Sequence, residues 1–173
     1  MKLIIAVLAL IWCLTGCAGP QSYETLSDTW VAPQIPEPMQ IHLELPETAA
    51  SPTLQTDTGD RLYLCDDYWI ALQTVTSGDL ERTLQDLTGY SLDALSPVQT
   101  MQDGVACYDC AWTLAGEGKT QTGRLRLLDD GNYHYAVSVL ADADQAGRLQ
   151  EQIQALFRSV SLKPAGFNPN TGS

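Results

Sequence analysis

Closely spaced turn signals divide the second half of the chain into short apolar segments, and this spacing constrains the fold more than any other feature. The turn signals are Asp103-Gly104, the pair Gly116 and Gly118, and 129–132. Asp-Gly between two such segments is a strong signal for a two-residue β-hairpin. The pattern predicts a meander of four antiparallel strands, at 98–102, 105–114, 120–128 and 133–140.

Further strands are expected before the meander. Residues 39–45 alternate apolar and polar side chains, which predicts a strand with one buried face. A polar stretch, 46–60, separates this strand from two more, at 61–65 and 69–75. The triplet Asp57-Thr58-Gly59 within the polar stretch echoes a protease motif, but it has no second copy and is interpreted as a turn.

Two segments change to helical spacing. In 79–88 the leucines fall on one face, with Ser77 or Asp79 as the N-cap and Gly89 just past the end. The second helix is expected over 144–159, where apolar residues form a stripe. Each helix must bury one apolar face, and a single antiparallel sheet can cover it. The sequence therefore predicts an α+β domain, with a twisted antiparallel β-sheet packed by two helices.

Three features of this domain resemble Mog1/PsbP-like proteins: the Asp103-Gly104 hairpin, the strand start at 131–135 and the helix end at 156–160. The resemblance implies a twisted antiparallel sheet packed by helices from either end of the meander. It also implies a binding or assembly module, because members of that fold share no active site. Another small α+β fold of sheet and helices is the alternative.

The N-terminus carries a signal for secretion. Lys2 precedes an uncharged apolar run, 3–14, which spans roughly 18 Å as a helix and is too short to cross a hydrocarbon core of about 30 Å. It ends in Leu14-Thr15-Gly16-Cys17, which resembles the lipobox of bacterial lipoproteins. The resemblance implies cleavage before Cys17 and acylation of that cysteine, with palmitate among the acyl chains, and two chains suffice for stable anchoring. An ordinary cleaved signal peptide with an incidental cysteine is the alternative.

These features divide the chain into four parts. Residues 1–16 form the lipoprotein signal peptide, and 17–38 form a flexible linker punctuated by prolines. A single domain occupies 39–163, and a disordered tail rich in glycine, proline and asparagine follows at 164–173. We expect the mature protein outside the cytoplasm, held by lipid on the bacterial cell membrane or outer membrane.

The charge of the chain restricts its partners. It has 9 basic and 21 acidic residues, a net charge of −12, and loss of Lys2 with the signal peptide makes the mature chain more negative. Such a surface repels phosphate backbones, so nucleic acid is not an expected partner. It also repels anionic headgroups, so membrane contact is expected through the lipid on Cys17.

The remaining cysteines are Cys65, Cys107 and Cys110. Outside the cytoplasm one disulfide is expected, joining Cys65 to Cys107 or Cys110. A redox pair within Cys107-x-x-Cys110 is disfavoured, because residues i and i+3 of a strand lie about 10 Å apart on opposite faces. A zinc site using the three cysteines with His134 is a further alternative.

No catalytic, metal or cofactor constellation emerges from the sequence. His42 and His134 fall in predicted strands and are interpreted as structural. Aromatic residues give the remaining hint of a binding surface, since pairs of them share strand faces, where they are either core or exposed: Tyr108 and Trp112, and Tyr133 and Tyr135.

Three hypotheses for function follow. The leading one is a non-enzymatic envelope lipoprotein whose acidic domain binds a protein or small-molecule partner near the membrane. The second is an assembly or structural factor for a membrane complex. The third is a hydrolase or metal-binding protein whose site lacks a recognisable motif.

Overall fold

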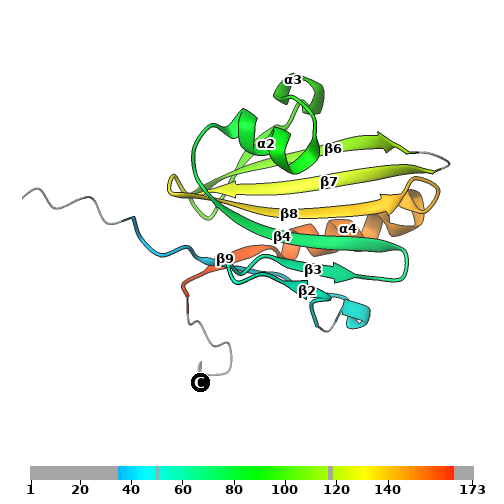
Figure 1. Cartoon of the computed structure of the whole chain (residues 1–173), viewed down its shortest axis with the longest axis horizontal. Helices are drawn as coiled ribbons and strands as arrows, with labels where there is room; N and C mark the ends of the chain where they lie inside the picture. The colour runs from blue at the N-terminus through cyan, green and yellow to red at the C-terminus, as the bar shows by residue number, and fades with distance from the viewer. Residues whose placement is uncertain (1–34, 50, 117–118, 166–173) are drawn as a thin grey trace, which may run out of the picture. The chain divides into compact units, whose positions relative to one another are not determined.

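A computed structural model describes residues 35–49, 51–116 and 119–165 (Figure 1). The predicted signal peptide, the lipobox with Cys17, most of the linker and nearly all of the C-terminal tail lie outside these residues. Within the described part of the chain, no helix is long and apolar enough to cross a membrane. Its regular elements run from Gln40 to Lys163.

In the described residues, seven strands form one antiparallel sheet. They are β2 (Leu54–Gln55), β3 (Arg61–Leu64), β4 (Tyr68–Thr76), β5 (Val98–Gln102), β6 (Val105–Ala115), β7 (Thr120–Asp129) and β8 (Tyr133–Asp142). Their spatial order is β2-β3-β4-β8-β7-β6-β5, so the predicted meander β5–β8 is present and β4 is added against β8. The hairpin turn has φ values of 52° at Asp103 and 82° at Gly104, the left-handed conformations that a two-residue turn needs. The predicted α+β class is confirmed.

One helix, α2 (Leu80–Thr88), has capping residues at both of its ends. The Asp79 carboxylate accepts a hydrogen bond from the Glu81 N–H at 2.9 Å. Gly89 ends this helix with φ 81°, and its N–H donates to the Gln85 carbonyl at 2.7 Å. The other helices in the described residues are η1 (Glu47–Ala49), α3 (Leu92–Leu95) and α4 (Ala146–Ser159).

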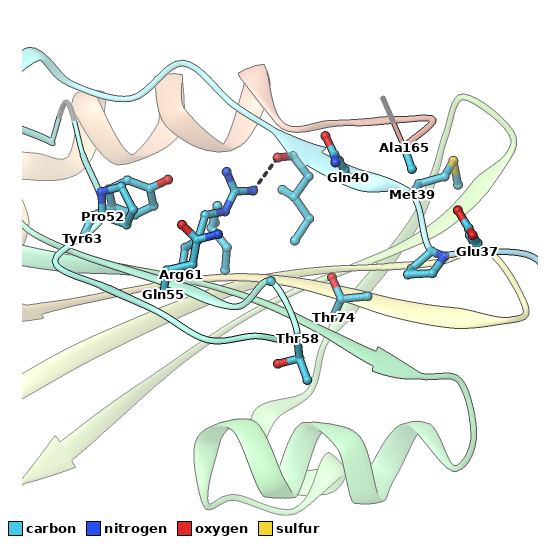
Figure 2. A pocket seen from close by; sticks show the side chains of 14 residues that line it. Glu37, Met39, Gln40, Pro52, Gln55, Thr58, Arg61, Tyr63, Thr74 and Ala165 are labelled. Carbon is cyan, nitrogen blue, oxygen red and sulfur yellow. Dashed lines mark hydrogen bonds between the residues drawn. The ribbon is translucent and has the colours of Figure 1, made fainter. Parts of the chain in front are cut away.

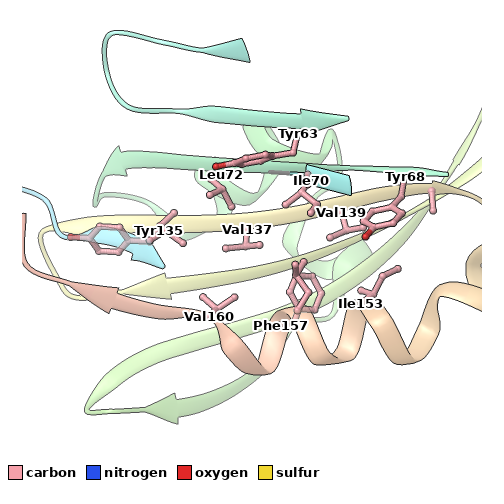
Figure 3. Close-up of a cluster of buried hydrophobic side chains, with 14 of the residues drawn as sticks. Tyr63, Tyr68, Ile70, Leu72, Tyr135, Val137, Val139, Ile153, Phe157 and Val160 are labelled. Carbon is pink, nitrogen blue, oxygen red and sulfur yellow. The ribbon is translucent and has the colours of Figure 1, made fainter. Parts of the chain in front are cut away.

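The helices cover opposite faces of the sheet. On one face, called the α4 face, Ile153 and Phe157 of α4 pack in one cluster with Val137 of β8 (Figure 3). On the other, called the α2 face, Leu84 of α2 packs in a second cluster with Leu127 of β7. The central strand β8 is buried on both sides, which explains its nearly continuous apolar sequence.

A second, two-stranded sheet pairs β1 (Gln40–His42) with β9 (Ser161–Lys163). The sequence did not predict β9, and β1 is shorter than the predicted strand over 39–45. Its pairing ends at His42, opposite Ser161, because the partner segment becomes helical two residues earlier, at Ser159. The Glu44 N–H therefore donates to the Ser159 hydroxyl, at 2.9 Å. Ile41 and Leu162 face each other in this ribbon, and buried Ile41 joins the α4-face core.

Candidate functional site

A cleft of about 460 Å³ opens between the N-terminal segment of the domain and strands β2–β4 (Figure 2). This volume suits a small molecule. We call it the Arg61 cleft, after the cation at its centre. It is lined by Glu37, Pro38, Met39, Gln40, Ile41, Pro52, Gln55, Thr58, Gly59, Arg61, Tyr63, Leu72, Thr74 and Ala165.

Two hydrogen bonds hold the N-terminal wall of the cleft against the sheet. The Arg61 Nη2 donates to the Ile41 carbonyl at 3.0 Å, and the Met39 N–H donates to the Tyr135 hydroxyl at 3.0 Å. The Tyr135 hydroxyl in turn donates to the Asp130 carboxylate at 2.8 Å. Burial raises the pKa of Tyr135, so the hydroxyl keeps the proton that it donates. The wall is thus fixed to both β3 and β8.

The β2–β3 turn forms the opposite rim. The expectation of a turn at Asp57-Thr58-Gly59 is confirmed: Gly59 has φ 90°, and its N–H donates to the Thr56 carbonyl at 3.0 Å. The turn is tied to the next strand through Asp60, whose carboxylate accepts from the Thr74 N–H at 3.1 Å. Thr74 lines the cleft together with Arg61, whereas the Thr58 hydroxyl is 2.7 Å from the Thr56 hydroxyl within the turn.

Arg61 gives the cleft its chemical character. It is partly buried and forms no ion pair within the described ranges, while its one hydrogen bond there uses a single guanidinium N–H. The remaining donors of a guanidinium suit a carboxylate or phosphate. Amides of Gln40 and Gln55 add polar groups, and Met39 adds apolar surface. The arrangement fits a small polar ligand with an anionic group.

The four aromatic residues predicted as a binding surface lie on two different faces. Tyr108 and Trp112 pack against the α2-face cluster. Tyr133 and Tyr135 lie with the α4-face cluster, their ring centroids 6.2 Å apart, and Tyr135 is buried. They do not form one continuous surface. Tyr135 contributes to the Arg61 cleft through the hydroxyl that holds Met39.

The predicted disulfide is wrong, because all three described cysteines are free thiols. Cys65 follows β3 and the other two lie in β6, with β4, β8 and β7 between these strands. At about 4.8 Å per strand the separation is roughly 19 Å, whereas a disulfide needs Cα atoms within about 7 Å. The expected placement of Cys107 and Cys110 on opposite faces is confirmed, since each belongs to a different core cluster.

Cys107 is buried, and Cys65 and Cys110 are partly buried. Desolvation raises the pKa of Cys65 and of Cys107, and it raises that of Cys110 to about 11. A thiol used in redox exchange has its pKa lowered. Within the described ranges no group of His, Cys, Asp or Glu side chains is arranged to hold a metal ion, so the zinc alternative finds no support there.

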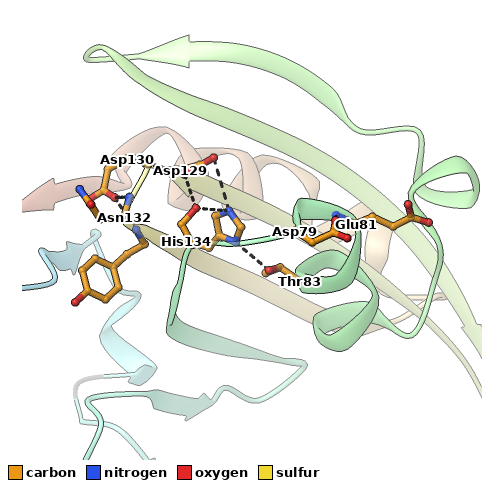
Figure 4. A network of polar contacts seen from close by, with 10 residues as sticks. Asp79, Glu81, Thr83, Asp129, Asp130, Asn132 and His134 are labelled. Atoms are coloured by element: carbon orange, nitrogen blue, oxygen red, sulfur yellow. Dashed lines mark hydrogen bonds and ion pairs between the residues drawn. The ribbon is translucent and has the colours of Figure 1, made fainter. Parts of the chain in front are cut away.

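His134 lies at the centre of a buried polar network between β8 and α2 (Figure 4). Its Nδ1 is 2.9 Å from the Thr83 hydroxyl, while its Nε2 is 3.2 Å from the Ser77 hydroxyl and 3.6 Å from the Asp129 carboxylate. In a serine–histidine–aspartate triad the hydroxyl and the carboxylate contact different ring nitrogens. Here the Asp129 carboxylate shares Nε2 with the Ser77 hydroxyl, while the Thr83 hydroxyl contacts Nδ1. Because the ring is fully buried, no substrate can reach it, and His134 fastens α2 to the sheet.

Sequence reasoning missed the residues that define the Arg61 cleft. Arg61 is one of several arginines and has no motif around it. The cleft exists because β1, near residue 40, pairs with β9, near residue 162. No local sequence pattern predicts that pairing. The scarcity of basic residues in an acidic chain was the available signal for Arg61.

Comparison with known proteins supports the fold. No protein-family model matches the chain, and no curated protein matches it. Its structure is similar to that of LpqN from Mycobacterium tuberculosis, which is described as involved in cell envelope biogenesis. The TM-score is 0.50 at 14% sequence identity, over 73% of this chain and 84% of LpqN.

A protein from Bacteroides thetaiotaomicron is similar with a TM-score of 0.51 at 12% identity. The match covers 73% of this chain and 46% of that protein, so this chain spans less than half of its length. At such identities both likenesses bear on the fold alone, and both are consistent with a small α+β domain.

Proposed function

We propose that this protein is a non-enzymatic lipoprotein of the bacterial cell envelope, anchored through Cys17, and that its acidic domain binds a small molecule in the Arg61 cleft. The observation that carries the proposal is the partly buried Arg61 guanidinium, which faces a cleft of ligand size without a carboxylate partner in the described ranges. In a chain of net charge −12, such an unpaired cation selects an anionic group on the ligand.

The lipobox-like segment at 14–17 supports the envelope location, and the likeness of fold to LpqN is compatible with it. LpqN is described as involved in cell envelope biogenesis. The cleft wall at 37–41 continues directly from the predicted linker, so a bound ligand would lie beside the segment that leads to the anchor.

Ligand binding is tested with dansylglycine, which joins an aromatic ring to a free carboxylate. We expect saturable fluorescence enhancement with the full chain in detergent. Arg61→Gln should weaken binding about tenfold, because a charge-assisted hydrogen bond is lost. Arg82→Gln is the matched control, since Arg82 lies on α2 with an exposed side chain. Equal affinity of the wild-type and Arg61→Gln proteins, or no saturable binding, would contradict the proposal.

Anchoring is tested by metabolic labelling with an alkynyl fatty acid followed by membrane fractionation. The wild-type protein should carry the label and sediment with membranes, whereas Cys17→Ser should lose both properties. Cys65→Ser is a control that keeps the label. Label retained by Cys17→Ser would show that another site is acylated.

A further inference from the structure

A second cavity, of about 510 Å³, lies near the opposite edge of the sheet. There the pairing of β5 with β6 stops at Val98 and Asp109, and β6 continues alone. We call it the Arg124 pocket. It shares no lining residue with the Arg61 cleft. Its floor comes from β6 and β7, one wall from α4 and the other from the turn between α3 and β5.

Three of the chain's nine basic residues line this pocket: Arg124, Arg126 and Arg158. Arg124 and Arg126 alternate on β7, so both project on the α4 face, and Arg158 comes from the last turn of α4. One lining carboxylate, Asp109, accompanies them. A cluster of like charges that exceeds its counter-charges favours an anion between them.

The three arginines differ in how many of their guanidinium N–H groups already donate hydrogen bonds. Arg126 is fixed, because its Nε and Nη2 donate to the two oxygens of Asp109 at 2.8 and 2.7 Å and its Nη1 donates to the Phe157 carbonyl at 2.6 Å. Arg158 makes a single exposed hydrogen bond, to Gln154 at 3.2 Å. Arg124 makes no hydrogen bond or ion pair with any residue that the structure describes. Two guanidiniums therefore remain to bind a ligand beside a fixed third.

The backbone of β6 contributes to the same place. In a two-residue hairpin the residue pair that closes the turn is hydrogen-bonded, and so is every second pair after it. The backbone N–H and C=O groups of Val105, Cys107 and Asp109 therefore point toward β5. By the same alternation the backbone groups of Ala111 point toward the same edge, where β5 no longer covers them. The Tyr90 hydroxyl, which donates to the Thr113 carbonyl at 2.6 Å, confirms this direction. The Ala111 N–H thus points outward from the open edge, beside the pocket.

We propose that the Arg124 pocket binds a phosphate group, carried by a soluble phosphate or by a phospholipid headgroup. Several guanidiniums and an edge N–H match the number and spread of acceptors on a tetrahedral oxyanion. An added peptide strand fits less well, because Tyr90 already occupies the Thr113 carbonyl and leaves a very short open edge. The site is independent of the small-molecule function proposed for the Arg61 cleft.

The test measures the rate at which phenylglyoxal modifies Arg124 in the full chain, followed by peptide mass spectrometry. In a sugar-based detergent, which carries no phosphate, inorganic phosphate at about ten times its Kd should slow the modification about tenfold. Sodium chloride of equal ionic strength should not. In bilayer discs of phosphatidylglycerol without free phosphate, slow modification would identify the headgroup as the source. Protection in either arm supports the proposal.

The variants separate this site from the Arg61 cleft and from general effects. Arg158→Gln changes an exposed side chain and should weaken phosphate binding about tenfold. The same phosphate concentration should then slow the modification only about twofold, whereas Arg61→Gln should leave the protection unchanged. Modification of Arg82 in the same sample reports the general rate. The proposal is overturned if neither phosphate source slows the modification of Arg124, or if chloride slows it equally.

Discussion

The backbone N–H of Met39 donates to the hydroxyl of Tyr135, at 3.0 Å and across 96 positions of the sequence. This bond joins the segment that leads to the predicted anchor to the central strand of the sheet. The same hydroxyl donates to Asp130 at 2.8 Å, so one buried phenol organises the N-terminal wall of the Arg61 cleft. The position of that wall therefore depends on the core.

Tyr135→Phe tests this dependence. The change leaves the Met39 N–H without its partner and should cost about 1–3 kcal/mol of unfolding free energy, as measured in urea. Hydrogen exchange should accelerate at Met39 and in β1, while β7 stays protected. Tyr133→Phe is the control, because no hydrogen bond of its hydroxyl is found in the described ranges. Unchanged exchange at Met39 would show that other contacts hold the wall.

Gly123 is required by the ring of Trp112, which lies across it on the α2 face. A Cβ at Gly123 would come within 2.1 Å of that ring, so Gly123→Ala must displace it. We expect a loss of about 1–3 kcal/mol in urea unfolding. Gly147→Ala in α4 meets open space and should be neutral or stabilising, because alanine favours the helix.

A second substitution checks the cause of that loss. Trp112→Val combined with Gly123→Ala should cost less than the sum of the two single changes, since the smaller side chain removes the collision. Additive costs would place the strain elsewhere.

The ion pair of Arg126 with Asp109 should contribute more than an exposed pair. Arg126 has a side chain 18% exposed, and it also donates to the Phe157 carbonyl, which closes the end of α4. Arg126→Gln should cost about 1–2 kcal/mol after allowance for solvent screening. Arg82→Gln, at an exposed pair separated by 3.9 Å, should cost about 0.5 kcal/mol or less. If the two variants lose equal unfolding free energy, the partial burial of the Arg126–Asp109 pair adds no stability.

Local signals predicted the meander and the helices well because the residues that decide them are neighbours in the sequence. Asp103-Gly104 alone sets a hairpin, and Asp79 with Gly89 sets both ends of α2. Strand order depends instead on contacts between distant segments. The pairing of Ile41 with Leu162 and of β4 with β8 had no local signature, and these pairings create the Arg61 cleft.

The same missing information explains the wrong disulfide. Cysteine count and compartment favoured one bond, but the pairing of β4 with β8 places Cys65 and Cys107 on strands far apart in the sheet. The Arg124 pocket was equally hidden. Arg124 and Arg158 are 34 positions apart in sequence and line one pocket only because α4 packs back against the sheet.

The free thiols give a further prediction. Protein purified without reductant and then denatured should show reactive Cys65, Cys107 and Cys110, with Cys17 blocked by lipid, whereas a disulfide would leave one of the three. In the folded protein, alkylation should be slow near neutral pH, because burial raises the pKa of all three thiols. It should be slowest at Cys107, because that side chain is buried.

Cys110 also links stability to alkaline pH. A raised pKa means that the folded state holds the thiol proton more tightly than the unfolded state, whose pKa is 9.0. The stabilisation is complete below that value and is lost as pH rises from 9.0 toward about 11. Urea unfolding across this window should show a decline that Cys110→Ala reduces, because alanine has no proton to release. An identical decline in Cys110→Ala would assign the effect to other groups, such as Tyr135, whose pKa burial also raises.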